Sequence, residues 1–347
     1  MPNCAPRSNR LAAWQMRSAN ALRWDGGPGH YEVYYVTLTD PATGIGVWVR
    51  YTMRAPIDGA AECALWFVAM APDGVRLARR ALFPAAELEG RDDPFRLRLA
   101  GADLSDRGAA GAIEGDAAWE LSWEPRLRPY AFVHPLVELA GVAQTELVLP
   151  HADLAISGTV RLGNRVLELD RARGAQGHLW GRRHAARWAW THCNDFHAPG
   201  GEPRRDTFVD AVSVHVERFG REFGPSTPVV GRFGGEDFVA TDPVAIVGAR
   251  SRFGLTAWRF EARAGRRKIV AEVEAPRASL AGVTYHDPDG RPAYCFNSEV
   301  ASMRLLVWDR TVRGRFGWTL RDTLTADGRA HFERGERVSV AGVELLV

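Results

Sequence analysis

Short runs dominate the pattern of apolar and polar positions along the chain. Apolar or alternating stretches recur throughout and are separated by Gly, Pro, Asp and Asn, which is typical of antiparallel sheets, sandwiches or barrels. Helical periodicity is scarce. The sequence therefore predicts an all-β protein. The predicted strands are 31–38, 47–53, 64–70, 95–99 and 118–123 in the first half, and 187–194, 211–218, 257–262, 268–274, 282–286, 292–297 and 303–309 in the second.

A hairpin is the most clearly marked local feature. The stretches 156–162 and 165–169 are strand-like, and they are separated only by Gly163 and Asn164. These two residue types accept the positive φ that a two-residue hairpin turn requires. We therefore expect the two stretches to pair across this turn.

The length of the chain predicts more than one domain. Single domains commonly contain about 100–200 residues, and this chain has 347. The segment 125–150 carries several prolines and a mixed apolar stretch, which is typical of a crossing segment. We expect two β domains of similar strand content, at 1–150 and 151–347.

Composition and charge narrow the class of protein. Hydrophobic residues make up 46% and charged residues 25%, as in ordinary folded proteins. The net charge is +2 and basic residues alternate with acidic ones, so no nucleic-acid partner is expected. The cysteines form no C-x-x-C pair, which favours a reducing compartment. They are Cys4, Cys63, Cys193 and Cys295.

Targeting and cofactor signals are also missing from the sequence. The first 15 residues lack the apolar core of a secretory signal, and no stretch of about 18 apolar residues could span a bilayer. We expect a cytoplasmic protein without an integral membrane segment, which is compatible with transient membrane contact.

There is no P-loop, dinucleotide fingerprint or G-x-S-x-G motif, so no cofactor is expected. The spacing of His178, His184, His192 and His197 does not match a compact metal site.

The segment 177–196 concentrates residues that can carry chemistry. Between His178 and Phe196 it contains three of the 12 tryptophans and three of the 10 histidines. If 187–196 is extended, one face carries Trp188, Trp190, His192, Asn194 and Phe196, whereas the other carries small residues. Such a face is typical of an aromatic cavity wall with a few polar groups. The alternative is that the tryptophans fill a core.

Two further segments place polar groups in apolar strands. In 294–299, alternation puts Cys295, Asn297 and Glu299 on one face, and a carboxyl group in an apolar cavity can act as a general acid. A pairing of Glu299 with an arginine is the alternative. Near the N-terminus, Glu32, His30, Arg50 and Tyr51 are candidates for a cavity or an interface, with an Arg50–Glu32 cross-strand pair as the structural alternative.

Several motifs together resemble a known family. They are Trp180-Gly181, Arg187-Trp188-Ala189-Trp190 with Cys193-Asn194 and Phe196, Asp25-Gly26, 29–35, 48–52 and 295–298. The motifs between Trp180 and Phe196 together are similar to the W-G…W-x-W…C-N-x-F signature of tocopherol cyclase-like proteins. The others resemble the wider lipocalin-like group that contains carotenoid 1,2-hydratases (hydroxyneurosporene synthases) and AttH-like proteins. The chain departs from the cyclase pattern at 183–186, where an aromatic-proline pair is usual, and at His192, where glutamine is usual.

The resemblance implies two lipocalin-like (calycin-type) antiparallel β-barrel domains, with a ligand in a lumen or at the domain junction. Members of the group include cofactor-independent enzymes that protonate an isoprenoid double bond and let water or a phenol trap the cation. Related fungal proteins catalyse intramolecular cycloadditions. The leading hypothesis is therefore a cofactor-free hydratase or cyclase acting on an apolar isoprenoid or polyene.

The sequence assigns roles within this hypothesis. His192 or Glu299 supplies the proton, and Trp180, Trp188 and Trp190 shape the substrate and stabilise a cation. The further predicted substrate-binding residues are Asn194, Asn297, His178, Arg50, Tyr51 and Glu32. The alternatives are a non-catalytic lipocalin-like carrier of the same kind of ligand, and a stress or scaffold protein with a vestigial cavity. The sequence does not indicate the oligomeric state.

Overall fold

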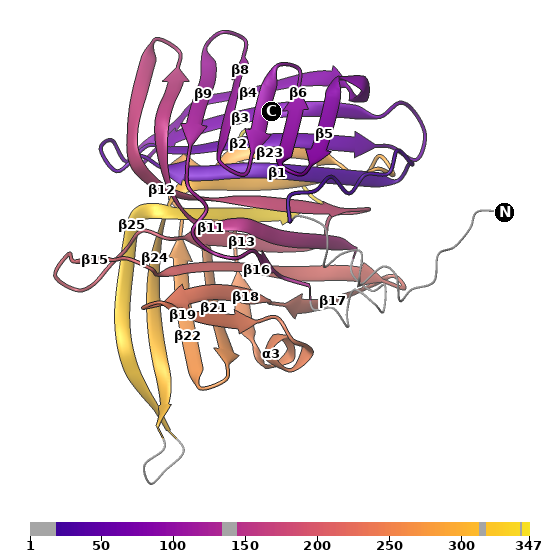
Figure 1. Ribbon diagram of the computed structural model, residues 1–347. Coiled ribbons are helices and arrows are strands. Elements are labelled where there is room, and N and C mark those ends of the chain that lie inside the picture. The colour runs from indigo at the N-terminus through magenta and orange to yellow at the C-terminus, as the bar shows by residue number, and fades with distance from the viewer. Residues whose placement is uncertain (1–18, 134–143, 312–316, 341) are drawn as a thin grey trace.

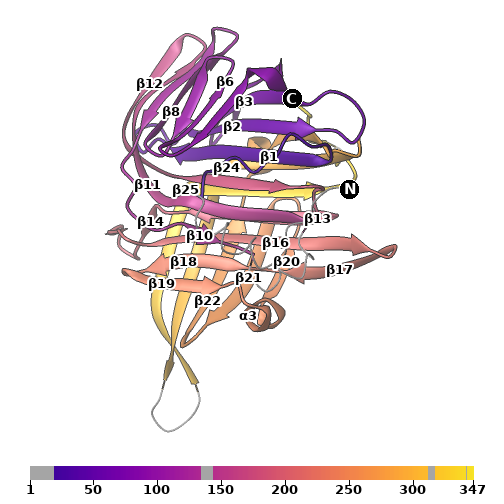
Figure 2. The same ribbon diagram turned by 45° about the vertical axis from the view of Figure 1, so that its right-hand side comes forward.

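Two stacked sheets make up most of the protein. The computed structural model describes residues 19–133, 144–311, 317–340 and 342–347. Within these ranges the first half of the chain forms one sheet and the second half another (Figures 1 and 2). Neighbouring strands pair in antiparallel fashion, including the long pairs at the centre of each sheet. The prediction of an all-β protein is confirmed.

The first sheet has 12 strands. In spatial order they are β4 (Gly74–Pro84), β3 (Glu62–Ala71), β2 (Gly46–Ala55), β1 (His30–Thr39), β12 (Arg165–Gly181), β11 (Thr145–Leu162), β9 (Ala117–Ser122), β8 (Gly108–Ile113), β7 (Ala102–Ser105), β6 (Phe95–Leu99) and β5 (Leu88–Asp92), with β10 (Tyr130–Ala131) beside β11. A short 3-10 turn, η1 (Ala85–Glu87), connects β4 to β5.

The second sheet has 13 strands. Its main path is β19 (Glu236–Ala240), β18 (Val229–Phe233), β16 (Phe208–Arg218), β13 (Arg187–Cys193), β25 (Gly317–Glu336), β24 (Pro292–Thr311), β22 (Arg267–Glu274), β21 (Ala257–Ala264) and β20 (Arg250–Phe253). Beside this path lie β14 (Phe196–His197), β15 (Pro203–Arg204), β17 (Arg221–Ser226) and β23 (Ala281–His286). The helix α3 (Pro243–Gly248) and the 3-10 turn η2 (Arg277–Ser279) are short connections.

Strands β1, β2 and β3 are buried on both faces because the first sheet packs against two different partners. On β1, Tyr34 and Val36 point into the core that the first sheet encloses. The alternate residues Val33 and Tyr35 instead join a cluster shared with the second sheet. The period of two along a strand thus divides one tyrosine-rich run between a core and an interface.

Strand β13 has the same double burial on the other side of this interface. Ala189 and Cys193 belong to the core of the second sheet. Trp188 and Trp190 point the other way, into the cluster that also contains Tyr35 from β1. The layer between the two sheets therefore receives the large aromatic side chains of β13, whereas the core of the second sheet takes its smaller residues.

The predicted hairpin is present and extends well beyond the predicted stretches. Leu162 pairs with Arg165 across the Gly163-Asn164 turn, where Gly163 has a φ of 59°. Strand β11 begins at Thr145 and runs through Pro150, and the register of its ladder to β12 shifts between Val148 and His151. Proline has no N–H to donate, and an irregularity in the ladder accommodates this loss.

The chain passes from the first sheet to the second between Gly181 and Arg187. The boundary predicted at 150/151 lies inside β11, and part of the predicted crossing segment lies outside the described residues. Sheet membership does not by itself define a domain, so the division into two domains stays a prediction. Within the described ranges, no helix has the length and apolar character needed to cross a membrane.

Candidate functional site

An apolar cavity of about 210 Å³ lies between the two sheets, and we call it the aromatic cavity. Aromatic and aliphatic side chains form most of its walls, and Arg50, Thr145, His184 and Glu333 bring polar atoms to it. The segment that joins the two sheets contributes His184 and Ala185. The full lining is Tyr31, Tyr35, Trp48, Arg50, Phe132, Val133, Thr145, Leu147, Leu179, His184, Ala185, Trp188, Trp190, Val212, Val214, Pro228, Tyr285 and Glu333.

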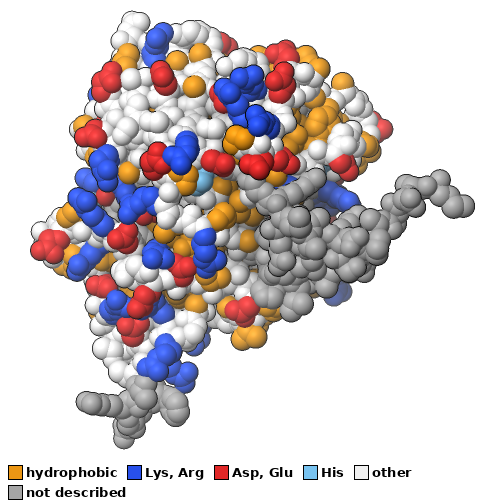
Figure 3. Space-filling model, viewed as in Figure 1, with side chains coloured by type: hydrophobic (Ala, Val, Ile, Leu, Met, Phe, Trp, Pro, Cys, Tyr) orange, Lys and Arg blue, Asp and Glu red, His pale blue; other side chains and the backbone are white. Residues whose placement is uncertain are grey.

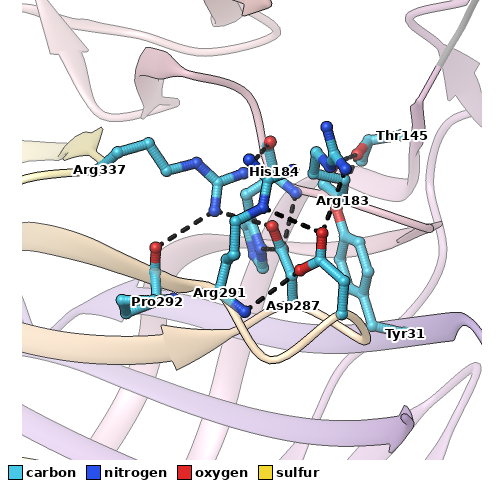
Figure 4. Close-up of polar contacts among 9 residues, drawn as sticks. Tyr31, Thr145, Arg183, His184, Asp287, Arg291, Pro292 and Arg337 are labelled. Carbon is cyan, nitrogen blue, oxygen red and sulfur yellow. Dashed lines mark hydrogen bonds and ion pairs between the residues drawn. The ribbon is translucent and has the colours of Figure 1, made fainter. Parts of the chain in front are cut away.

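His184 and Asp287 form a buried pair at this cavity. Asp287 directly follows β23, and its Oδ1 lies 2.6 Å from His184 Nδ1 and accepts the backbone N–H of His184 at 2.9 Å. The other carboxylate oxygen pairs with Arg337 Nη1 at 2.7 Å. Arg337 also donates to the carbonyl oxygen of His184. Figure 4 shows this arrangement, in which one carboxylate fixes both the backbone and the ring of His184.

The electrostatics of this pair set its protonation. Burial lowers the pKa of His184 more than the neighbouring Asp287 raises it, so the ring is neutral at neutral pH. Burial raises the pKa of Asp287, but hydrogen bonds from His184 and the charge of Arg337 outweigh this effect, and the pKa lies below its ordinary value. Because the carboxylate only accepts, Nδ1 of His184 carries the hydrogen. Nε2 then carries a lone pair, and no described residue forms a hydrogen bond with it.

Aromatic rings hold His184 in place. Its ring stacks on Tyr31 at 4.6 Å between centroids, on Tyr285 at 5.3 Å and on Trp188 at 5.5 Å. The hydroxyl of Thr145 donates to the carbonyl oxygen of Arg183 at 2.9 Å, so it accepts from the phenol of Tyr31 at 2.7 Å. The imidazole is therefore fixed by stacking and by hydrogen bonds before any ligand binds.

Three residues of the sequence-based prediction line the aromatic cavity: Trp188, Trp190 and Arg50. The indole N–H of Trp188 donates to Glu333, and that of Trp190 donates to Asp210 at 3.0 Å. The alternation along β13 does place both indoles on one face. It ends with the strand at Cys193, and Phe196 joins the opposite core.

The two predicted proton donors, His192 and Glu299, are not part of the lining of the aromatic cavity. His192, Asp210, Glu299 and His331 are at most 1% exposed and do not line the cavity; we call them the sealed cluster. His192 Nδ1 lies 3.1 Å from Asp210 Oδ2, and Glu299 Oε2 lies 2.6 Å from His331 Nδ1. Thr37 also donates to Glu299. No arginine of the described ranges pairs with Glu299, as the alternative had proposed.

Glu32, His178 and Trp180 form a separate group at the other side of β1 and β12. Glu32 accepts from the backbone N–H groups of Arg23 and Trp24, each at 2.8 Å, and from His178 at 2.9 Å. Burial raises the pKa of Glu32, but hydrogen bonds from His178 and His30 and from the backbone of Arg23 lower it to about 2. His178 and Trp180 are in ring contact at 4.7 Å. The group ties down the N-terminal segment, and the pairing of Arg50 with Glu32 does not occur.

The remaining predicted residues lie at three further places. Tyr51 is in the core of the first sheet, where Trp119 donates to its hydroxyl at 2.9 Å. The amide of Asn194 donates to Asp153 and to the carbonyl oxygen of Gly174, at 3.0 and 2.8 Å. Asn297 is fully buried on β24. The structure thus brings together only part of the predicted set.

The residues that sequence reasoning missed come from four distant segments. They are Tyr31, His184, Tyr285, Asp287 and Glu333. His184 and Asp287 are 103 positions apart, so no local motif joins them. One signal was present in the sequence: His184 lies in the segment that departs from the aromatic-proline pattern of the cyclases.

A larger cleft of about 610 Å³ lies elsewhere, and six arginines and Asn194 line it. Several of these arginines already have carboxylate partners, including Arg126 with Asp206 at 3.1 Å and Arg173 with Asp153. Acidic and basic side chains are also interspersed over the face of the molecule drawn in Figure 3. The aromatic cavity is therefore the stronger candidate site. Among the described residues, no group of histidine, cysteine and acidic side chains is arranged to hold a metal ion.

Fold and cavity together define a two-sheet β protein with a histidine-aspartate pair at the sheet interface. No family model matches the chain. Two curated relatives, the uncharacterized proteins MT0513 and Rv0493c of Mycobacterium tuberculosis strains CDC 1551 / Oshkosh and ATCC 25618 / H37Rv, are each 32% identical over 306 residues. The match covers 85% of this chain and 87% of each relative. The chain belongs to the family of these mycobacterial proteins.

Solved structures confirm the lipocalin-like fold. A putative AttH (NE1406) from Nitrosomonas europaea is 14% identical with a TM-score of 0.53, and covers 92% of this chain and 98% of its own. CghA with Sch210972 is 10% identical with a TM-score of 0.56, and 89% of each chain is covered. Kievitone hydratase from Nectria haematococca is 9% identical with a TM-score of 0.50, covering 93% and 92%. The resemblance to AttH-like proteins holds at the level of fold, whereas that to tocopherol cyclases and carotenoid hydratases stays a prediction.

Proposed function

We propose that the protein is a cofactor-independent hydratase or cyclase that acts on an apolar small molecule in the aromatic cavity. The observation that carries this proposal is the His184–Asp287 pair, a fixed acid–base group at a cavity whose walls are otherwise mainly apolar. A cavity of this kind binds the ligand skeleton by burial and orients it through few polar contacts. The proposal moves the proton-transferring role from His192 and Glu299 to His184.

The geometry supports general acid–base catalysis by one imidazole. Nε2 of neutral His184 takes a proton from a water molecule or a substrate hydroxyl as its oxygen bonds to a carbon of a double bond that is conjugated with a carbonyl group, and the carbonyl oxygen takes up the electron pair of that double bond. The charged ring is stabilised by Asp287 and returns the proton to the neighbouring carbon of the former double bond. Water as nucleophile gives a hydrated product, whereas an internal hydroxyl closes a ring. Both outcomes need no electron carrier, because no net oxidation or reduction occurs.

The walls support an isoprenoid or polyene skeleton. Trp188 and Trp190 present indole rings to the cavity, and Tyr31, Tyr35 and Tyr285 present phenols. The rings of Tyr31, Trp188 and Tyr285 also stack on His184, and aromatic faces stabilise a cation such as its charged ring by about 0.5–2 kcal/mol per contact. Two structures of similar fold are consistent with this chemistry: one is named as a hydratase, and CghA was solved with the small molecule Sch210972.

A screen in labelled water tests the proposal. The purified protein is incubated with isoprenoid and polyene alkenes in ¹⁸O-labelled water, and products are followed by mass spectrometry. A hydratase gives a product that carries one labelled oxygen, and a cyclase gives an isomer of unchanged mass. The His184→Gln variant is the control and should abolish either product. Turnover that is unchanged in His184→Gln would refute the assignment of the site.

A carrier of the same ligand class is the second candidate. The apolar cavity walls favour it, because burial of an apolar skeleton needs no acid–base group. A carrier releases its ligand chemically unchanged, and replacing His184 by glutamine then alters affinity at most. Mass spectrometry of ligands extracted from the purified protein, before and after incubation in labelled water, separates the two functions.

A further inference from the structure

Arg50 is a buried cation at the wall of the aromatic cavity. It lies on β2, is 6% exposed, and pairs in register with Tyr35 of β1 and Trp66 of β3. Its guanidinium lies 4.0 Å from the ring centroid of Tyr285 and 5.5 Å from that of Trp48. Stacking on two aromatic faces holds the guanidinium plane and leaves its N–H edge for hydrogen bonds.

These hydrogen bonds are not made within the protein. Among the described residues, no side chain or backbone oxygen accepts from Arg50, and Nε is buried without an acceptor. No carboxylate oxygen of the described residues lies within 4.0 Å of its nitrogens. Arg54, four positions further along β2, instead donates to Glu62 at 2.8 and 3.0 Å. Of these two arginines on β2, the one that lines the cavity lacks a partner and the one outside it has one.

A buried charge without hydrogen bonds destabilises a protein unless something else compensates it. Glu333 is the carboxylate that lines the same cavity, and it accepts from the indole of Trp188 instead. Asp287 also lies nearby, but its Oδ1 interacts with His184 and its Oδ2 lies 2.7 Å from Arg337 Nη1. The other groups at the cavity that face Arg50 are aromatic or neutral: Tyr31, Tyr35, Trp48, His184 and Tyr285.

We propose that Arg50 binds the carboxylate of the ligand, so that the occupant of the aromatic cavity is an organic acid with an apolar skeleton. This inference rests on the proposed function for its site and adds the chemical class of the substrate. A guanidinium and a carboxylate form two parallel hydrogen bonds, which fixes the orientation of the acid as well as its position. The apolar skeleton then extends along the aromatic walls that also hold His184.

Binding of a matched pair of probes tests the inference without any need for turnover. Geranic acid and methyl geranate share an isoprenoid skeleton and differ in the charge of the head group. Isothermal titration at neutral pH should show that the wild-type protein binds the acid about tenfold or more tightly than the ester, as expected for a hydrogen-bonded buried charge pair. Equal affinity for the two probes, or binding of neither one, would overturn the inference.

Three variants test whether Arg50 is the residue that causes the preference for the acid. Arg50→Gln should lose the preference for the acid, whereas Arg54→Gln, which removes the same charge from the same strand outside the cavity lining, should keep it. Arg50→Lys retains the charge without the parallel pair of N–H groups and should keep part of the preference. Circular dichroism checks that each variant is folded, and if Arg50→Gln does not fold, a reduced preference in Arg50→Lys decides for the inference and an unchanged preference decides against it. An Arg50→Gln protein that still prefers the acid would refute the role of Arg50.

These experiments distinguish a failure of the Arg50 inference from a failure of the proposed function. A protein that binds the acid through Arg50 but converts no alkene in labelled water supports this inference and contradicts catalysis. Turnover of neutral alkenes that is lost in His184→Gln and unchanged in Arg50→Gln supports catalysis and contradicts this inference.

Discussion

His184 with Asp287 and His192 with Asp210 are the same chemical pair in two different settings. The first pair lines the aromatic cavity, and the second belongs to the sealed cluster. No described residue forms a hydrogen bond with Nε2 in either ring, but Nε2 of His192 is enclosed by protein whereas His184 is at a cavity wall. Access of a ligand to the ring, more than residue type or local sequence, therefore decides which histidine can take part in chemistry.

The two pairs also differ in charge. Burial moves the pKa of His192 well below and that of Asp210 well above their ordinary values, so this pair is neutral. Asp287 keeps its charge, because His184 and Arg337 lower its pKa more than burial raises it. A charged carboxylate can stabilise the imidazolium that forms during proton transfer, whereas a protonated one cannot. The pair at the cavity is therefore the one suited to catalysis.

The largest expected effect is a difference in kcat between variants of His184 and His192. His184→Gln should lower kcat by about 100-fold or more, because it removes the general acid–base group. His192→Gln, the matched change in the sealed cluster, should leave kcat within about threefold of wild type, since no ligand reaches that position. Steady-state kinetics on a substrate from the labelled-water screen measures both. The reverse order of effects would place the chemistry in the sealed cluster.

The pH dependence sharpens the comparison. Because burial keeps the pKa of His184 below its ordinary value, the base form is already present at neutral pH. kcat/KM should be flat from neutral pH upward and fall about tenfold per pH unit below that pKa. Asp287→Asn removes the group that raises the pKa of His184, so the acid limb should move to lower pH. An acid limb that Asp287→Asn does not move would point to a different base.

A substitution in the sealed cluster should lower the stability of the protein without changing its kcat. Glu299→Ala leaves the buried hydroxyl of Thr37 without its acceptor and removes the carboxylate beside His331, which should lower the free energy of unfolding by about 1–3 kcal/mol. Urea denaturation measures this loss. The folded fraction of the variant should keep the kcat of wild type, and a loss of kcat larger than tenfold would make Glu299 more than a structural residue.

The smallest expected effect is a change in kcat/KM caused by a substitution in the wall of the aromatic cavity. Trp188→Phe keeps an aromatic face and loses the indole N–H that Glu333 accepts, so kcat/KM should fall by a factor of about 2–10. Trp66→Phe is the control, because Trp66 belongs to the same aromatic cluster, donates to Thr52 and does not line the aromatic cavity. Equal effects of the two changes would indicate loss of packing instead of loss of a ligand contact.

The sequence predicted what depends on local periodicity. Alternation in 31–38 and 187–193 identified strands, and it correctly placed Trp188 and Trp190 on one face. The turn at Gly163-Asn164 followed from backbone preference. The predicted start of the first hairpin strand at Ile156 is wrong, because β11 begins at Thr145 and a ladder irregularity accommodates Pro150.

The sequence could not predict which faces meet across the sheet interface. Alternation shows that His192 shares a strand with Trp190, but not that the cavity ends before His192. The pairing of His184 with Asp287 depends on where β23 ends relative to the segment between the sheets. These placements result from packing between distant segments, and one sequence carries no local signal for them.

A crystal structure of the protein with geranic acid bound is the most direct test of the central claim, that the aromatic cavity is the functional site. The account predicts the acid inside the cavity, with its carboxylate on Arg50 and a carbon of its double bond in contact with His184 Nε2. An acid bound instead in the arginine-lined cleft near Arg173 and Asn194, with the aromatic cavity unchanged, would contradict it.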